Sequence, residues 1–156
     1  MKTLVVYYSK TGNTKYVAEK IAENLGAEIS EITDKKNRKG KLNFVKSGYE
    51  SIRKKLTEIE VNKKINGYDF VIVGSPVWAG KIAPAARTFL VKNDFADKKL
   101  AFFVTIGGKK PEKALRAMKE IVSPQNPVSE LAITEALKNI DEINNKISNW
   151  CKKLIL

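Results

Sequence analysis

Three continuous apolar runs constrain the fold of this chain more than any other feature. They span residues 4–8, 70–73 and 100–104, and within each run the apolar side chains do not alternate with polar ones. This pattern is typical of strands at the centre of a parallel sheet, where helices bury both faces. We therefore expect an α/β structure built around these three strands.

The segments between these runs complete the pattern. Residues 27–32 and 128–133 mix apolar and polar side chains, which suits strands at the edges of a sheet. Apolar residues recur with helical spacing in five further segments, at 17–25, 44–56, 82–91, 111–122 and 140–154. Right-handed crossovers then predict a doubly wound, five-stranded parallel sheet in the order 2-1-3-4-5. A single domain over residues 1–156 is expected.

Composition limits the chemistry of such a domain. The chain has no histidine and one cysteine, Cys151, so Ser-His or Cys-His pairs, imidazole metal sites and internal disulfides are excluded. We predict no metal site, and Cys151 is expected to be a small packing residue. No apolar stretch approaches the roughly 20 residues that span a bilayer, so we expect a cytoplasmic protein without a membrane partner.

Three glycine-containing loops follow the three central strands, at residues 9–14, 74–80 and 105–108. The loops after the edge strands, at 33–36 and 134–136, contain no glycine. In the predicted strand order the first three loops meet at the switch point, where ligands bind beyond the carboxyl ends of the strands. A ligand site between these loops is expected.

The first loop, with the sequence SKTGNT, suits a phosphate group. It opens a predicted helix, whose first N–H groups and partial positive charge attract anions. Gly12 lets the backbone amides turn inward, and hydroxyls from Ser9, Thr11 and Thr14 can donate hydrogen bonds. Neither a Walker loop nor a G-x-G-x-x-G motif is present. The residues alone leave ordinary helix capping open as the alternative.

The other two loops suit a planar ring. Trp78, followed by the small residues Ala79 and Gly80, can lay its indole against a ring system and is not expected deep in the core. The Gly107-Gly108 pair exposes backbone for hydrogen bonding. A tryptophan packed over its own loop and a simple glycine turn are the alternatives.

With these motifs in order after strands 1, 3 and 4, the chain resembles the flavodoxins over essentially its full length. The resemblance implies the flavodoxin fold, FMN as cofactor, and a low-potential protein that passes single electrons between redox proteins. It also implies that FMN carries the redox chemistry, so no catalytic side chain is expected. The residues it implies for the 5′-phosphate are Ser9, Lys10, Thr11, Gly12, Asn13 and Thr14. Those it implies for the two sides of the isoalloxazine ring are Pro76, Val77, Trp78, Ala79 and Gly80 on one side, and Thr105, Ile106, Gly107 and Gly108 on the other.

One departure from the family leaves an enzymatic alternative open. Many flavodoxins cover the ring with a second aromatic residue from the loop after strand 4, where this chain has Ile106 and two glycines. A more open ring would suit an FMN-dependent NAD(P)H oxidoreductase that reduces quinones. The short chain, without a long insertion to build a nicotinamide pocket, favours the electron carrier.

The charge is a second departure, because flavodoxins are typically acidic and this chain carries a net charge of +12. Lys10, Lys81, Lys109 and Lys110 lie in or next to the three loops. They predict a less negative potential for the fully reduced flavin, and acidic partners such as ferredoxin-like or iron–sulfur proteins. Residues 34–64 hold eleven basic and four acidic residues, which suits either a docking face or a solvated surface. No nucleic-acid partner is expected, and a monomer is favoured.

Overall fold

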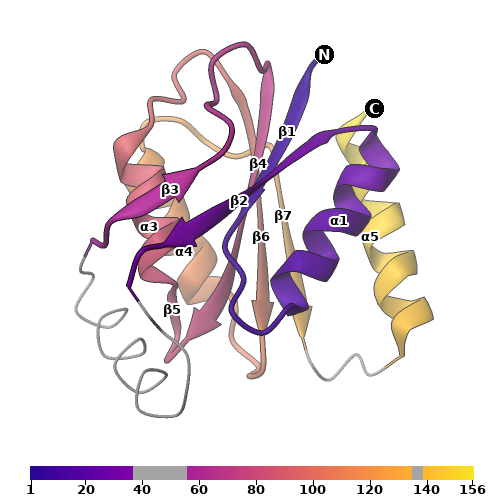
Figure 1. Ribbon diagram of the computed structural model, residues 1–156. Coiled ribbons are helices and arrows are strands. Elements are labelled where there is room, and N and C mark those ends of the chain that lie inside the picture. The colour runs from indigo at the N-terminus through magenta and orange to yellow at the C-terminus, as the bar shows by residue number, and fades with distance from the viewer. Residues whose placement is uncertain (37–55, 135–138) are drawn as a thin grey trace.

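A mostly parallel sheet lies between two layers of helices in the computed structural model, which describes residues 1–36, 56–134 and 139–156 (Figure 1). Helices α1 (Asn13–Leu25) and α5 (Ile140–Leu154) cover one face of the sheet. Helices α3 (Pro84–Lys92) and α4 (Glu112–Val122) cover the other. No helix in the described part of the chain is long and apolar enough to cross a membrane.

In the described ranges, five parallel strands make up most of the sheet. They are β1 (Thr3–Tyr7), β2 (Glu28–Asp34), β4 (Phe70–Trp78), β6 (Lys99–Ile106) and β7 (Ser129–Thr134). Their spatial order is β2-β1-β4-β6-β7. This confirms the predicted order of the five parallel strands, so β1, β4 and β6 end side by side at one edge of the sheet, here called the carboxyl edge.

Two short antiparallel strands were not predicted. Strand β3 (Ile59–Val61) pairs with β2 at the margin of the sheet, and β5 (Lys81–Ile82) folds back on the end of β4. The prediction of a loop over 74–80 was therefore wrong, because β4 continues to Trp78. Only Ala79 and Gly80 form the turn, both with positive φ (48° and 74°), which is the geometry of a two-residue hairpin. Helix α3 consequently begins at Pro84 rather than at residue 82.

The helix predicted over 44–56 lies outside the described residues except for its last position, as do positions 135–136 of the last predicted loop. The remaining predicted helices agree with α1, α3, α4 and α5 to within a few residues.

Both faces of the central strands are buried, as the continuous apolar runs predict. Along β1, Leu4 and Val6 pack toward α3 and α4, whereas Val5 and Tyr7 pack toward α1 and α5. Cys151 lies in the second of these cores at 2% exposure, and burial raises the pKa of its thiol to about 11. This burial agrees with the packing role expected of Cys151.

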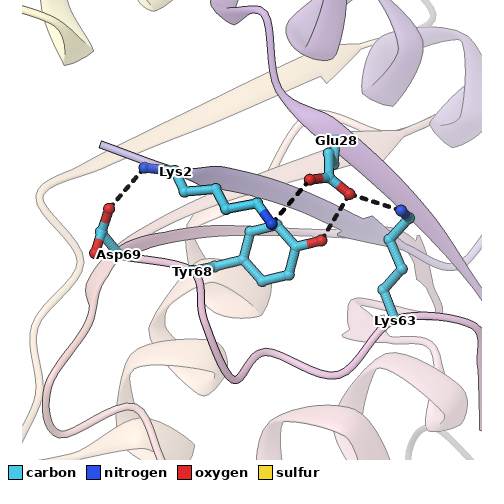
Figure 2. A network of polar contacts seen from close by, with 5 residues as sticks. All are labelled: Lys2, Glu28, Lys63, Tyr68 and Asp69. Atoms are coloured by element: carbon cyan, nitrogen blue, oxygen red, sulfur yellow. Dashed lines mark hydrogen bonds and ion pairs between the residues drawn. The ribbon is translucent and has the colours of Figure 1, made fainter.

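A network of polar side chains closes the opposite, amino edge of the sheet (Figure 2). The Glu28 carboxylate accepts hydrogen bonds from Lys63 Nζ at 2.6 Å and from the Tyr68 hydroxyl at 2.8 Å, and pairs with Lys2 Nζ at 3.2 Å. The Lys2 backbone N–H donates to Asp69 at 2.6 Å. These contacts join the starts of β1, β2 and β4, and the bonds from Lys63, Tyr68 and Lys2 lower the pKa of Glu28 to about 2.

Candidate functional site

A cavity of about 730 Å³ opens at the carboxyl edge, toward which the arrows of the parallel strands point in Figure 1. It is bounded by the start of α1, the β4–β5 turn and the end of β6. The structure brings together all the predicted site residues except Ser9 and Gly12. Those that line the cavity are Lys10, Thr11, Asn13, Thr14, Pro76, Val77, Trp78, Ala79, Gly80, Thr105, Ile106, Gly107 and Gly108.

The start of α1 presents uncapped backbone N–H groups. Gly12 is the N-cap residue with φ of 100°, and as a glycine it provides no side chain to cap the first N–H groups of the helix. The Ser9 hydroxyl instead accepts from the Gly12 N–H at 3.1 Å, so it stabilises the turn before the helix. Ordinary side-chain capping is thus not what these residues provide. Since the first turn of α1 contains no acidic residue, its partial positive charge is available to an anion.

A buried hydrogen bond connects α1 with β6. The predicted loops are shorter in the structure than expected, because Asn13 and Thr14 belong to α1, and Thr105 and Ile106 to β6. The Oγ1 atoms of Thr14 and Thr105 lie 2.7 Å apart, and the two residues are 1% and 8% exposed. Each hydroxyl has one proton to donate, so this bond uses one of the two protons. One hydroxyl proton of the pair therefore remains for a ligand. The sequence had instead predicted that Thr14 donates independently of any other residue.

Trp78 forms the wall of the cavity between β1 and the β4–β5 turn. Its ring meets Tyr8 edge to face, with centroids 5.7 Å apart and planes at 84°, and Lys10 Nζ lies 5.5 Å from its centroid. The residue is only 6% exposed, so it is more deeply placed than the sequence predicted, yet it lines the cavity. An indole held on several sides offers a fixed planar surface to a ligand.

A further wall of the cavity was missed by sequence reasoning. It is formed where α1, β7 and α5 meet, by Tyr16, Val17, Ile133, Thr134, Ile140 and Ile143. The Tyr16 hydroxyl donates to Asn144 Oδ1 at 2.7 Å and so ties α1 to α5. The available signal was the position of Thr134 at the end of a parallel strand, since every such strand ends at the same edge, but the loop that follows contains no glycine and was not predicted as part of the site.

Among the lining residues that the structure describes, the titratable side chains are Lys10 and Tyr16. The rest of the lining consists of hydroxyls, one amide, glycine backbone and apolar or aromatic groups. Within the described ranges, no cluster of three or more acidic, cysteine or histidine side chains could hold a metal ion. This lining is suited to binding and orienting a partly anionic, partly aromatic molecule.

The comparison with protein families decides the assignment. The model of the family described as flavodoxin matches residues 2–154. The chain belongs to the flavodoxin family.

Solved flavoproteins share this fold over nearly the full chain. A flavoprotein from Lactobacillus acidophilus, crystallised in complex with FMN, is 25% identical with a TM-score of 0.76, over 96% of this chain and 97% of that chain. The apo-form of a flavoprotein from the same organism, solved by NMR, is 27% identical with a TM-score of 0.69, over 88% and 95%. Oxidised Flavodoxin 2 from Bacillus cereus, 22% identical with a TM-score of 0.61 over 97% and 95%, shows likeness of fold alone. A comparison with curated proteins gives no match.

Proposed function

We propose that the cavity at the carboxyl edge binds FMN and that the protein carries single electrons between redox proteins. The observation that carries this proposal is that one cavity contains both the uncapped start of α1 and the indole of Trp78. In this proposal the amides that begin α1, with Thr11, Asn13 and Thr14, hold the phosphate. Residues 76–80 and 105–108 flank the isoalloxazine ring.

The lining fits FMN in size and in chemistry. About 730 Å³ lies within the range of ordinary ligand pockets, roughly 300–1,000 Å³. The hydroxyls and helix amides match the anionic end of the cofactor, and Trp78 matches its planar end. Bound FMN supplies the redox chemistry, while the chain binds it, orients it and limits its contact with water.

The Ala79-Gly80 turn is assigned to the edge of the ring. Both residues line the cavity and both have positive φ, and neither has a long side chain, so a ligand can approach their backbone groups closely. Gly80 at φ 74° permits peptide orientations that a residue with a Cβ resists. In this proposal the turn can adjust its hydrogen bonding to the ring as the charge on the cofactor changes.

Spectroscopy of the purified protein tests cofactor binding. We expect the visible absorbance of a flavin in the protein as isolated, or its recovery when the apoprotein is mixed with FMN, with a dissociation constant of about 1 μM or less. A protein that stays colourless and takes up no FMN would overturn the proposal.

An FMN-dependent NAD(P)H oxidoreductase is the second candidate, and the loop after β6 favours it. Ile106 is followed by two exposed glycines, Gly107 and Gly108, so no aromatic side chain from this loop covers a ring. Mixing the FMN-loaded protein with NADPH or NADH discriminates between the two functions. Loss of flavin colour within seconds, without a second protein, would assign the enzyme, whereas a carrier keeps its colour.

The partner of the carrier is proposed to be an acidic redox protein. Lys109 and Lys110 are exposed, directly follow the Gly107-Gly108 pair, and form no ion pair with any residue the structure describes. At the amino edge, by contrast, Lys2 and Lys63 are paired with Glu28. Unpaired cations beside the cavity attract a negatively charged surface and steer its approach.

Charge reversal tests whether Lys109 and Lys110 form the surface that docks an acidic partner. We expect K109E/K110E to slow electron transfer to an acidic [2Fe–2S] ferredoxin several-fold, and added salt to slow the unmodified protein in the same way. K152E/K153E is the matched control, because Lys152 and Lys153 are exposed in the last turn of α5, at the opposite end of the molecule (Figure 1). Equal slowing by both double variants would show that the transfer rate depends on the net charge of the protein and not on Lys109 and Lys110, which would overturn the proposed docking site.

A further inference from the structure

Lys10 belongs to the first loop by sequence but lies beside the indole in space. Its Nζ atom is 5.5 Å from the centroid of the Trp78 ring and is shielded from solvent, and both residues line the cavity. The strand pairing accounts for this placement. Tyr7 at the end of β1 is opposite Gly74, and β4 continues past that point to Trp78, beside the segment that contains Lys10.

We propose that Lys10 is a positioning charge that makes the site bind reduced FMN more tightly than oxidised FMN. This inference rests on the proposed FMN binding. The oxidised ring is neutral, and reduction by two electrons with uptake of one proton gives a ring that carries one negative charge. A cation held beside the ring favours the charged state over the neutral one. The midpoint potential of the bound cofactor therefore rises.

The other lysines near the cavity are less suited to this role. Lys109 and Lys110 are exposed and do not line the cavity, so water and salt screen their charges. Lys81 is opposite Trp78 in the β4–β5 pairing but is not among the lining residues. Only Lys10 combines a lining position, a contact with the indole and an ammonium group shielded from solvent, among the lysines that the structure describes.

The size of the effect follows from Coulomb's law. One unit charge within about 10 Å, at an effective dielectric constant of about 40, changes the binding of an anion about fourfold. For a two-electron couple, where a tenfold change in the equilibrium constant is 29.6 mV, fourfold corresponds to about 18 mV.

The test is a redox titration of the FMN-loaded protein combined with FMN binding to the oxidised apoprotein. In K10M we expect the ratio of the reduced-state to the oxidised-state affinity to fall about fourfold, with a matching fall in the midpoint potential. K10R, which keeps the charge, should restore most of the ratio. K15M is the control, because Lys15 is exposed on α1 and does not line the cavity, and its ratio should stay unchanged.

Lys10 could act on the flavin ring or on the phosphate. Riboflavin, which has the ring but lacks the phosphate, separates these two roles. Under the proposal K10M also lowers the reduced-to-oxidised ratio for riboflavin. If K10M instead weakens both states of FMN equally and leaves riboflavin binding unaffected, Lys10 serves the phosphate and the proposal is overturned. If the unmodified protein binds no FMN, the proposed function fails as well, so the two failures are distinguishable.

Discussion

Replacing Thr105 by valine tests the buried bond that joins two sides of the cavity. Valine substitutes a methyl group for the hydroxyl at nearly constant volume, so the change isolates the bond between the two Oγ1 atoms, which are 2.7 Å apart. It leaves the Thr14 hydroxyl without this partner at 1% exposure. A buried polar group that loses its partner costs about 1–3 kcal/mol, and the same reasoning applies to Thr14→Val.

The double variant carries the decisive information. With both hydroxyls replaced, no unsatisfied group is left behind, so T14V/T105V should lose less free energy of unfolding than the sum of the two single variants. We expect the shortfall to be about 1–2 kcal/mol, within the range of coupling energies for residues in contact. For a chain of this size, 1 kcal/mol corresponds to a shift of about 2–4 °C in Tm.

Urea unfolding of the apoprotein, followed by tryptophan fluorescence and circular dichroism, is the assay. Thr11→Val is the control, because Thr11 is exposed at the mouth of the same cavity, and its loss should stay below about 0.5 kcal/mol. Losses that add up in the double variant would refute the reasoning, since they would show that the two hydroxyls do not interact.

Three further predictions concern the framework around the cavity. A Cβ on Gly74 would lie 1.9 Å from Cζ of the fully buried Phe103, so Gly74→Ala should lower the free energy of unfolding by about 1–3 kcal/mol, and G74A/F103L should recover part of it. Ala79 adopts φ of 48°, so Ala79→Asn, which tolerates this region, should raise stability by up to about 1 kcal/mol, and a loss would argue against the left-handed turn. Because the pKa of Glu28 is lowered to about 2, its contribution to stability is present above about pH 5 and is lost as the pH falls toward 2; Glu28→Gln should flatten this dependence in acid unfolding curves.

The parallel sheet could be predicted because burial on both faces leaves continuous apolar runs, which mark β1, β4 and β6 directly. The two antiparallel strands, β3 and β5, could not be predicted from the sequence. Strand β3 has three residues and β5 has two, and segments this short cannot show an alternation of apolar and polar side chains. The turn between β4 and β5 uses Ala-Gly rather than the Asn-Gly or Asp-Gly pair that signals such hairpins, so its sequence resembles a loop.

The site was predictable in part for a related reason. Glycine, hydroxyl and indole groups at and just beyond the ends of the central strands are unusual in a core, so they indicated where a ligand would meet the chain. Apolar residues such as Val17, Ile133 and Ile143 follow the ordinary spacing of buried positions, and only the packing of α1, β7 and α5 shows that they line a cavity. The bond between Thr14 and Thr105 joins residues 91 positions apart, which local sequence does not encode.

The measurement that tests the central claim most directly compares FMN and riboflavin on the same apoprotein. If the amides and hydroxyls at the start of α1 hold the phosphate, FMN should bind at least about tenfold more tightly than riboflavin, the equivalent of about one charge-assisted hydrogen bond. Equal dissociation constants for the two flavins would contradict the account, since they would show that the start of α1 makes no use of the anion.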